Sequence, residues 1–193
     1  MIAPAPFSAL TREEEALLLR LAWRAVRAAV EGRDVPGQAE DHPLLRAPRD
    51  AFVTLRRGAA LRGCVGTWQA ARPLHENLLR AARGAAIDDP RFPPVEQPEL
   101  DGLRIEVTLL DPPFPIASPE TIEVGRHGLS VTLGRARGLL LPQVALEHGL
   151  DAEAFLGLAC RKAGLPPDAW RGAARVEVFT AQSVSDDVGA REA

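Results

Sequence analysis

Two β-hairpin patterns separated by a helical segment constrain this chain more than any other feature of its sequence. Residues 51–68, AFVTLRRGAALRGCVGTW, alternate apolar and polar side chains on both sides of a turn that contains Gly58. Residues 128–143, GLSVTLGRARGLLLPQ, show a second hairpin pattern. Hairpins join antiparallel strands, whereas parallel strands need long crossover connections. The sequence therefore predicts an α+β fold with a mainly antiparallel sheet flanked by helices.

The remaining elements are predicted from local periodicity and from residues typical of helix ends. A helix over 11–30 begins with a capping box, in which Thr11 is followed three residues later by Glu14. The other predicted elements are, in chain order, a helix over 72–92, a strand over 103–113, a helix over 150–165 and one last strand over 173–184. The ordered core is expected to span residues 10–184 of a single two-lobed domain.

Composition excludes several classes of protein. The 193 residues suffice for one globular domain, and the net charge of −3 gives no overall basic field for nucleic acid. Two cysteines do not make a disulfide framework, and the first ten residues have no signal-peptide pattern. No apolar run is long enough to span a membrane. We therefore expect a cytoplasmic protein that binds neither nucleic acid nor a membrane; the oligomeric state is left open.

A series of sequence blocks resembles one known family. The first block is LRGCVGT at 61–67, and the order of the blocks is more specific than any of them alone. The others are AAIDDPRFPPV (85–95), LRIEVTLLDPP (103–113), EVGRHGLSVTLGRARGLLLPQVALEHG (123–149) and FLGLACRKAGL (155–165). Together they resemble the AMMECR domain family, named for the AMME chromosomal region. The resemblance covers the chain from about Leu17 to Val184.

The resemblance carries expectations about fold and partners, and fewer about chemistry. It implies a larger lobe around an antiparallel sheet, a smaller lobe beside it, and a site in a cleft between them that the LRGC strand lines. Bacterial and archaeal members are called AmmeMemoRadiSam system protein A, so Memo-like and radical SAM proteins are the partners that the resemblance suggests. It does not imply a defined reaction.

Cys64 is the first candidate for a catalytic residue. Gly63 and Gly66 are expected to leave the backbone open to a ligand, and Thr67 offers a hydroxyl. Arg62 stands two residues before Cys64, so regular strand alternation places both side chains on one face, where Arg62 would meet an anionic group. The alternative is that Cys64 is a small apolar residue in the core, since free cysteine is often buried.

His127, Glu106 and Gln143 complete the candidate site. His127 lies in the turn sequence GRHGLS, and an imidazole with a pKa near 6.5 suits proton transfer. Glu106 lies on the polar face of its predicted strand, where it would orient His127 or act as an acid or base. Gln143 would bind substrate. The alternatives are a turn histidine bound to backbone, a surface carboxylate, and an amide that ties the lobes together.

Two functions from different classes follow. The first is an enzyme that performs acyl transfer, hydrolysis or isomerisation on a small polar metabolite, with Cys64, His127 and Glu106 as catalytic residues. The second is a non-catalytic module that binds a small ligand or a protein segment. No metal site and no cofactor is predicted, because the sequence contains no metal-ligand spacing and no phosphate-binding loop. The segment 88–92, DDPRF, is expected to form a loop clamp with Phe92 in the core, and Cys160 is expected to be a core residue.

Overall fold

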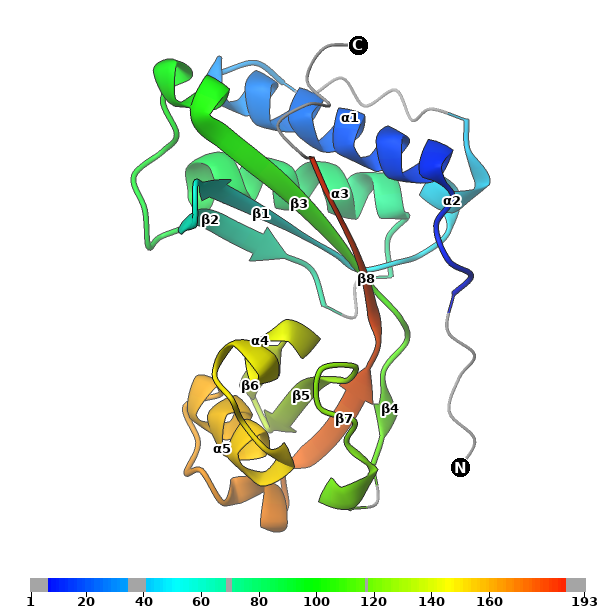
Figure 1. Cartoon of the computed structure of the whole chain (residues 1–193), viewed down its shortest axis with the longest axis vertical. Coiled ribbons are helices and arrows are strands. Elements are labelled where there is room, and N and C mark those ends of the chain that lie inside the picture. The colour runs from blue at the N-terminus through cyan, green and yellow to red at the C-terminus, as the bar shows by residue number, and fades with distance from the viewer. Residues whose placement is uncertain (1–6, 35–40, 69–70, 117, 187–193) are drawn as a thin grey trace. The chain divides into compact units, whose positions relative to one another are not determined.

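The computed structural model describes residues 7–34, 41–68, 71–116 and 118–186. They form two compact units. The larger unit contains the described residues within 9–109 and 182–193, and the smaller unit those within 1–8 and 110–181. The two units are coloured continuously along the chain in Figure 1 and are described separately below.

The larger unit is a four-stranded sheet with two long helices on one face. Its sheet order is β2-β1-β3-β8, and the register of β1 with β2 and with β3 is antiparallel. The helices α1 and α3 lie on the same side of this sheet in Figure 1. The elements are α1 (Arg12–Val30), α2 (Pro43–Arg46), β1 (Ala51–Arg57), β2 (Ala60–Gly66), α3 (Leu74–Arg83), a π-helical turn (Gly84–Asp88), a 3-10 helix (Gln97–Gly102), β3 (Leu103–Leu110) and β8 (Ala181–Ser185).

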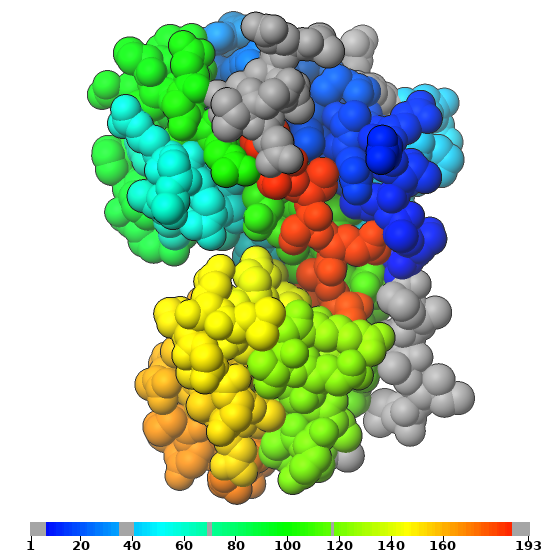
Figure 2. Space-filling view, viewed as in Figure 1, coloured from blue at the N-terminus to red at the C-terminus, as the bar shows by residue number. Residues whose placement is uncertain are grey.

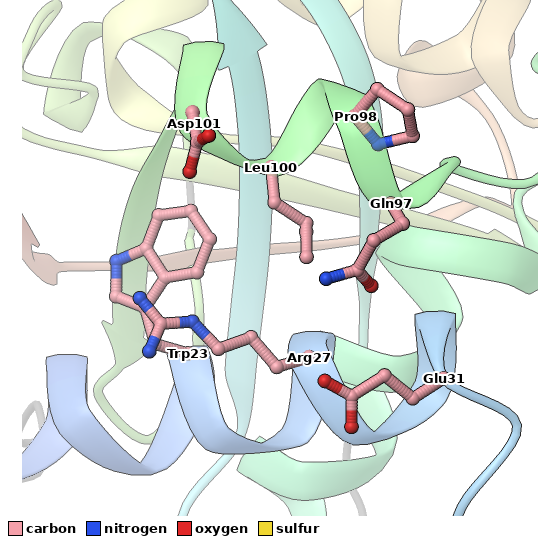
Figure 3. Close-up of a pocket in the computed structure, with 7 residues that line it drawn as sticks. All are labelled: Trp23, Arg27, Glu31, Gln97, Pro98, Leu100 and Asp101. Atoms are coloured by element: carbon pink, nitrogen blue, oxygen red, sulfur yellow. The ribbon is translucent and has the colours of Figure 1, made fainter.

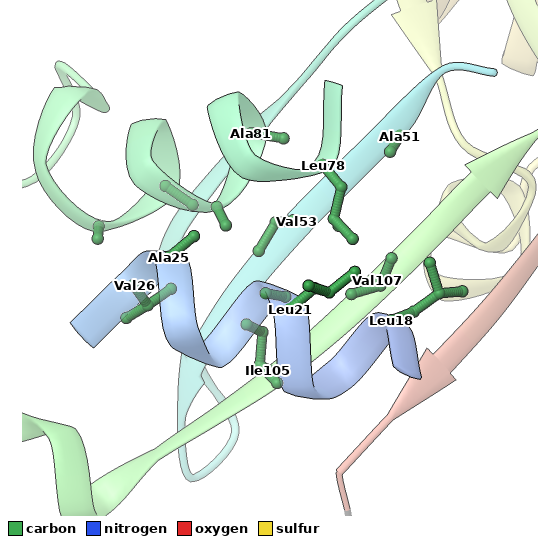
Figure 4. Packing of buried hydrophobic residues seen from close by; sticks show 14 of the residues in the cluster. Leu18, Leu21, Ala25, Val26, Ala51, Val53, Leu78, Ala81, Ile105 and Val107 are labelled. Atoms are coloured by element: carbon green, nitrogen blue, oxygen red, sulfur yellow. The ribbon is translucent and has the colours of Figure 1, made fainter. Parts of the chain in front are cut away.

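The core of the larger unit lies between these helices and the sheet, as Figure 4 shows. Leu18 and Leu21 of α1 and Val53 of β1 are at most 3% exposed. The predicted capping box is present. The Thr11 hydroxyl accepts a hydrogen bond from the backbone N–H of Glu14, and the Glu14 carboxylate accepts one from the backbone N–H of Thr11. This cap fixes the start of α1, and burial of its apolar stripe holds the helix on the sheet.

The smaller unit is a second four-stranded antiparallel sheet, in the order β4-β7-β5-β6. Helix α5 packs on it, and Cys160 is fully buried there, which confirms the prediction that Cys160 is a core residue. The elements are β4 (Phe114–Pro115), a 3-10 helix (Pro119–Thr121), β5 (Gly128–Leu133), β6 (Ala136–Leu140), α4 (Pro142–Glu147), α5 (Ala152–Lys162), a 3-10 helix (Ala169–Arg171) and β7 (Arg175–Phe179).

The α+β fold with antiparallel sheets is confirmed, and two predicted elements differ in detail. The single strand expected over 173–184 is two strands, β7 and β8, which belong to different sheets. Thr180 stands between them and accepts a hydrogen bond from the backbone N–H of Asp111 at 2.9 Å. The helix expected over 72–92 ends as α3 at Arg83 and continues as the π-helical turn. The first departure is accompanied by the bond between Thr180 and Asp111, two residues far apart in the sequence.

The surface shown in Figure 2 places the start of α1 beside β8 in the larger unit. The Gln182 side-chain oxygen accepts a hydrogen bond from the backbone N–H of Leu10 at 3.0 Å. Across the described part of the chain, no helix combines the length and the apolar character that crossing a membrane would require.

Candidate functional site

Cys64 belongs to a row of polar side chains that crosses three strands of the larger unit. Thr54 of β1 lies directly opposite Cys64 of β2 and directly opposite Glu106 of β3. Residues paired in this way point to the same face of a sheet. Val53 and Leu55, the neighbours of Thr54, face the core under the helices, so the row Cys64, Thr54, Glu106 lies on the opposite face. We call these three residues the polar row.

Hydrogen bonds connect the polar row to further hydroxyl groups. The Thr54 hydroxyl donates to the Cys64 sulfur at 3.4 Å. Thr108 donates to Glu106 Oε1 at 3.5 Å and shares a hydrogen bond of 2.8 Å with the Ser183 hydroxyl. Cys64 and Glu106 are both half-buried. Cys64 is therefore not among the fully buried residues of the core.

The main chain of Cys64 is held by the DDPRF segment. The Asp89 carboxylate accepts from the backbone N–H of Cys64 at 2.8 Å, and the Arg91 guanidinium donates to the Cys64 carbonyl at 3.0 Å. Asp89 and Arg91 are also joined by hydrogen bonds of 2.9 and 2.7 Å. The segment is thus the predicted clamp, and it covers the outer edge of β2. The expectation for Phe92 was wrong: Phe92 is half-buried beneath the Arg91 guanidinium, and Val95 fills the core.

Asp89 is a charged group held almost out of contact with solvent, since its side chain is 4% exposed. Hydrogen bonds from the Arg91 side chain hold the pKa of Asp89 well below its usual range, and those from the backbone of Cys64 and Arg91 add to this effect. Burial acts in the opposite direction and is outweighed. Asp89 therefore stays ionised, and it binds the backbone N–H of Cys64 at the free edge of β2, opposite the edge that pairs with β1.

Arg62 is the extra residue of a bulge in β2. The pairing of Leu55 with Gly63 and of Arg56 with Leu61 leaves Arg62 without a residue opposite it. Its guanidinium donates to Glu99 at 2.8 and 2.9 Å and to the carbonyl groups of Pro93 and Pro94 at 2.9 and 3.2 Å. The side chain is bound within the protein, and its binding of an anionic ligand stays a prediction without a contact to support it.

The two glycines beside Cys64 allow close packing of the chain on itself. A Cβ atom on Gly63 would lie 2.0 Å from the Ala85 carbonyl oxygen in the π-helical turn. A Cβ atom on Gly66 would lie 2.2 Å from the Phe52 ring. The expectation that these glycines leave the backbone open is not met, because neighbouring residues occupy that space. Thr67 closes the strand pair: its hydroxyl accepts from the backbone N–H of Ala51 at 3.2 Å.

His127 and Gln143 lie in the smaller unit, whereas Cys64 and Glu106 lie in the larger one. His127 is 6% exposed, and its Nδ1 accepts a hydrogen bond from the backbone N–H of Glu123 at 3.0 Å. Burial is the main cause that lowers its pKa. The ring is therefore neutral near pH 7 with its proton on Nε2. Gln143 is half-buried at the start of α4.

The described residues contain no group of three or more histidine, cysteine, aspartate or glutamate side chains arranged to hold a metal ion.

Thr54 is the member of the polar row that sequence reasoning missed. Counting back from the hairpin turn, where Arg57 pairs with Ala60, a regular register would place Thr54 opposite Gly63. The bulge at Arg62 shifts this pairing by one residue, and the local sequence gives no signal for it.

This is an α+β protein of two compact units, each built on an antiparallel sheet. The sheet of the larger unit bears the half-buried Cys64 on its polar face. Residues 19–184 match the family model AMMECR1, and the chain belongs to this family.

Similar proteins come from archaea. A protein of Methanothermobacter thermautotrophicus is 43% identical over 94% of this chain and 98% of its own length. A protein of Thermofilum pendens is 45% identical over 90% of both chains. The crystal structure of the uncharacterised protein PH0010 from Pyrococcus horikoshii is similar with a TM-score of 0.86 and 41% identity, and the match covers 92% of this chain and 94% of that one.

Proposed function

We propose that this protein is an enzyme that acts on a small polar metabolite, with Cys64 as its reactive group and Glu106 as its acid or base. The observation that supports the proposal is the polar row, in which one threonine lies opposite both residues. A nucleophilic thiol must be accessible and positioned, and Cys64 is half-buried with its main chain clamped by Asp89 and Arg91.

The spacing of the row suggests how a substrate would lie. Cys64 and Glu106 are separated by two strand intervals, roughly 10 Å, so the carboxylate does not contact the thiol directly. Thr54 itself is only 6% exposed, so a small substrate would reach the row at its half-buried ends, with the sulfur at one end and the carboxylate at the other. In acyl transfer or hydrolysis, the thiol would pass its proton to Glu106 through bound water, and the sulfur would attack a carbonyl carbon. Glu106 would return that proton to the leaving group as the bond between the leaving group and the carbonyl carbon breaks. Glu106 would then take a proton from the incoming nucleophile, which displaces the sulfur from the carbonyl carbon, and the thiolate would be reprotonated.

A second function is favoured by the contacts of the other candidate residues. Arg62 is bound to Glu99, and Thr67 is bound to the backbone of Ala51, so neither side chain is directed to a ligand. With these two candidate substrate-binding groups engaged inside the protein, the second candidate is a module that binds a ligand or a protein segment through other residues without transforming it. Memo-like and radical SAM proteins are the partners that the family resemblance suggests for such a module.

One experiment separates the two functions. The protein is incubated with a pool of polar metabolites, and both the solution and the protein-bound fraction are analysed by mass spectrometry. An enzyme consumes a compound, and Cys64→Ala and Glu106→Gln abolish the consumption while Cys160→Ala, in the core of the smaller unit, does not. A binding module retains a compound unchanged. If no compound is consumed, the enzyme proposal fails. If none is retained either, the binding of a small ligand fails as well, and binding of a protein segment is the form of the second function left to test. His127→Gln in the same assay tests whether His127 serves the same chemistry.

A further inference from the structure

The larger unit carries a groove along the exposed side of α1, separate from the polar row. This α1 groove has a volume of about 700 Å³ and is bounded by α1, the residues directly after it, and Val184–Asp186 at the end of β8. Its floor contains the apolar side chains of Ala16, Leu19 and Trp23. The polar row, on the other face of the sheet, contributes no residue to it.

A second hollow continues the α1 groove toward the 3-10 helix before β3. It has a volume of about 530 Å³ and shares Trp23, Arg27 and Glu31 with the groove. Figure 3 shows Arg27 extended along α1 toward Trp23, and its guanidinium carbon lies 5.6 Å from the centre of the ring. The two hollows together follow α1 from Arg12 to Glu31, a length of roughly 28 Å.

The α1 groove is more basic than the chain as a whole. Five arginines line it against three carboxylates, those of Glu15, Glu31 and Asp186, in a protein whose net charge is −3. The arginines are Arg12, Arg20, Arg24, Arg27 and Arg33. Asp186 is only 3% exposed, because its two oxygens accept from the Trp23 indole at 2.8 Å and from the backbone of Ile105 at 2.7 Å. Its charge is turned into the protein. Arg33 is ion-paired with Glu31, so the remaining four arginines outnumber the one remaining carboxylate of the rim, Glu15.

We propose that the α1 groove binds an acidic, amphipathic peptide segment of a partner protein. The length fits an extended segment of about eight residues, since each residue advances the chain by about 3.3 Å. Alternate carboxylate side chains would pair with the arginines of the rim while the apolar ones between them pack on Leu19 and Trp23. A small metabolite would occupy only a fraction of such a groove.

Nucleic acid fits the same surface less well. A phosphate chain is uniformly negative, and Glu15 and Glu31 interrupt the row of arginines. Single-stranded nucleic acids are held by several aromatic rings on which bases stack. Among the residues that the structure describes, Trp23 is the one aromatic residue that lines the α1 groove and the adjoining hollow.

The probe for the test is a fluorescein-labelled peptide of about ten residues in which glutamate and leucine alternate, measured by fluorescence polarisation with the full chain. Two further peptides replace glutamate with lysine, or leucine with serine. The test variant carries Arg20→Glu and Arg27→Glu, both at exposed positions of the groove. The matched control carries Arg80→Glu and Arg135→Glu, two exposed arginines that do not line it.

We expect the Glu-Leu peptide to bind, and the test variant to weaken that binding by about tenfold or more while the control variant leaves it unchanged. Binding should also weaken as salt is added, and the lysine and serine peptides should bind less tightly than the Glu-Leu peptide. If circular dichroism shows that the test variant is unfolded, Arg27→Gln alone should still weaken binding measurably. The proposal is overturned if the Glu-Leu peptide does not bind the protein, or if the test variant binds it as tightly as the wild type does. It is also overturned if a fluorescein-labelled oligothymidylate, measured in the same way, binds the wild type as tightly as the Glu-Leu peptide does. None of these readouts depends on Cys64, so they are independent of the proposed enzyme activity.

Discussion

Arg62 and Glu99 form a two-pronged ion pair, with the guanidinium donating to the two carboxylate oxygens at 2.8 and 2.9 Å. The pair joins the bulge of β2 to the 3-10 helix before β3, because Glu99 is a residue of that helix. Glu99 also accepts from the backbone N–H of Glu96, the residue that precedes the helix, at 2.9 Å. Both side chains are largely buried, at 13% and 20% exposure. This contact fixes the bulged residue two positions before Cys64.

We predict that Arg62→Ala lowers the free energy of unfolding by about 2–3 kcal/mol, since it leaves Glu99 and two carbonyl groups without their donor. Urea denaturation measures this loss. Arg80→Ala, at an exposed position of α3, serves as the control and should change stability by less than about 0.5 kcal/mol. Equal stability of the two variants would show that the ion pair contributes nothing.

Acid should weaken the larger unit. Hydrogen bonds from Arg62 lower the pKa of Glu99 to about 2, and those from Arg91 hold the pKa of Asp89 well below its usual range. Unfolded carboxylates titrate near pH 4, so this stabilisation is complete above about pH 5 and is lost as the pH falls from about 4 toward 2.

For Glu99 the loss is expected to be about 2 kcal/mol, measured by urea denaturation from pH 6 to pH 2.5. Glu99→Gln should reduce the slope of stability against pH, whereas Glu147→Gln, at an exposed position, should not. An unchanged slope in Glu99→Gln would contradict the prediction.

Gly63→Ala should destabilise the protein by about 1–3 kcal/mol or more, because the added methyl group meets the Ala85 carbonyl at 2.0 Å. Gly102→Ala is the matched control, since a Cβ atom there has only the Arg57 side chain nearby, at 3.7 Å. Thermal unfolding of the two variants checks this directly. Were Gly63→Ala as stable as Gly102→Ala, the close approach of β2 and the π-helical turn would not be required.

Thr54→Val tests the polar row. The substitution keeps the shape of the side chain and removes the hydrogen bond to the Cys64 sulfur, so we expect a loss of about 1 kcal/mol in stability. The rate of iodoacetamide labelling of Cys64, followed by peptide mass spectrometry, should change, while the buried Cys160 should stay unlabelled in the folded protein. An unchanged rate would show that Thr54 does not influence the thiol.

His127 should make the smaller unit sensitive to mild acid. Burial lowers the pKa of His127 below the value of about 6.5 that it has in the unfolded chain, so its contribution to stability is complete above that pH and is lost as the pH falls. Protonation of Nδ1 would also remove the acceptor of the Glu123 backbone N–H. The melting temperature from pH 8 to pH 5 should fall less in His127→Gln than in the wild type. His148→Gln, an exposed position, is the control and should follow the wild type.

The sequence by itself determined the elements that depend on near neighbours. The capping box of Thr11 and Glu14 and the two hairpins are where the pattern placed them, because both are set by residues a few positions apart. The α+β class followed from the hairpins. The family followed from the order of several blocks, which no single motif would establish.

Only the tertiary structure decided which side chains meet at Cys64. The bulge that places Cys64 opposite Thr54 is held by Glu99 and by the carbonyl groups of Pro93 and Pro94, all more than 30 residues away along the chain. The division of the last predicted strand between two sheets likewise depends on Asp111, which pairs with Thr180. A local sequence pattern shows how side chains alternate along a strand. The register of that strand depends on the groups, distant in the sequence, that pair with it.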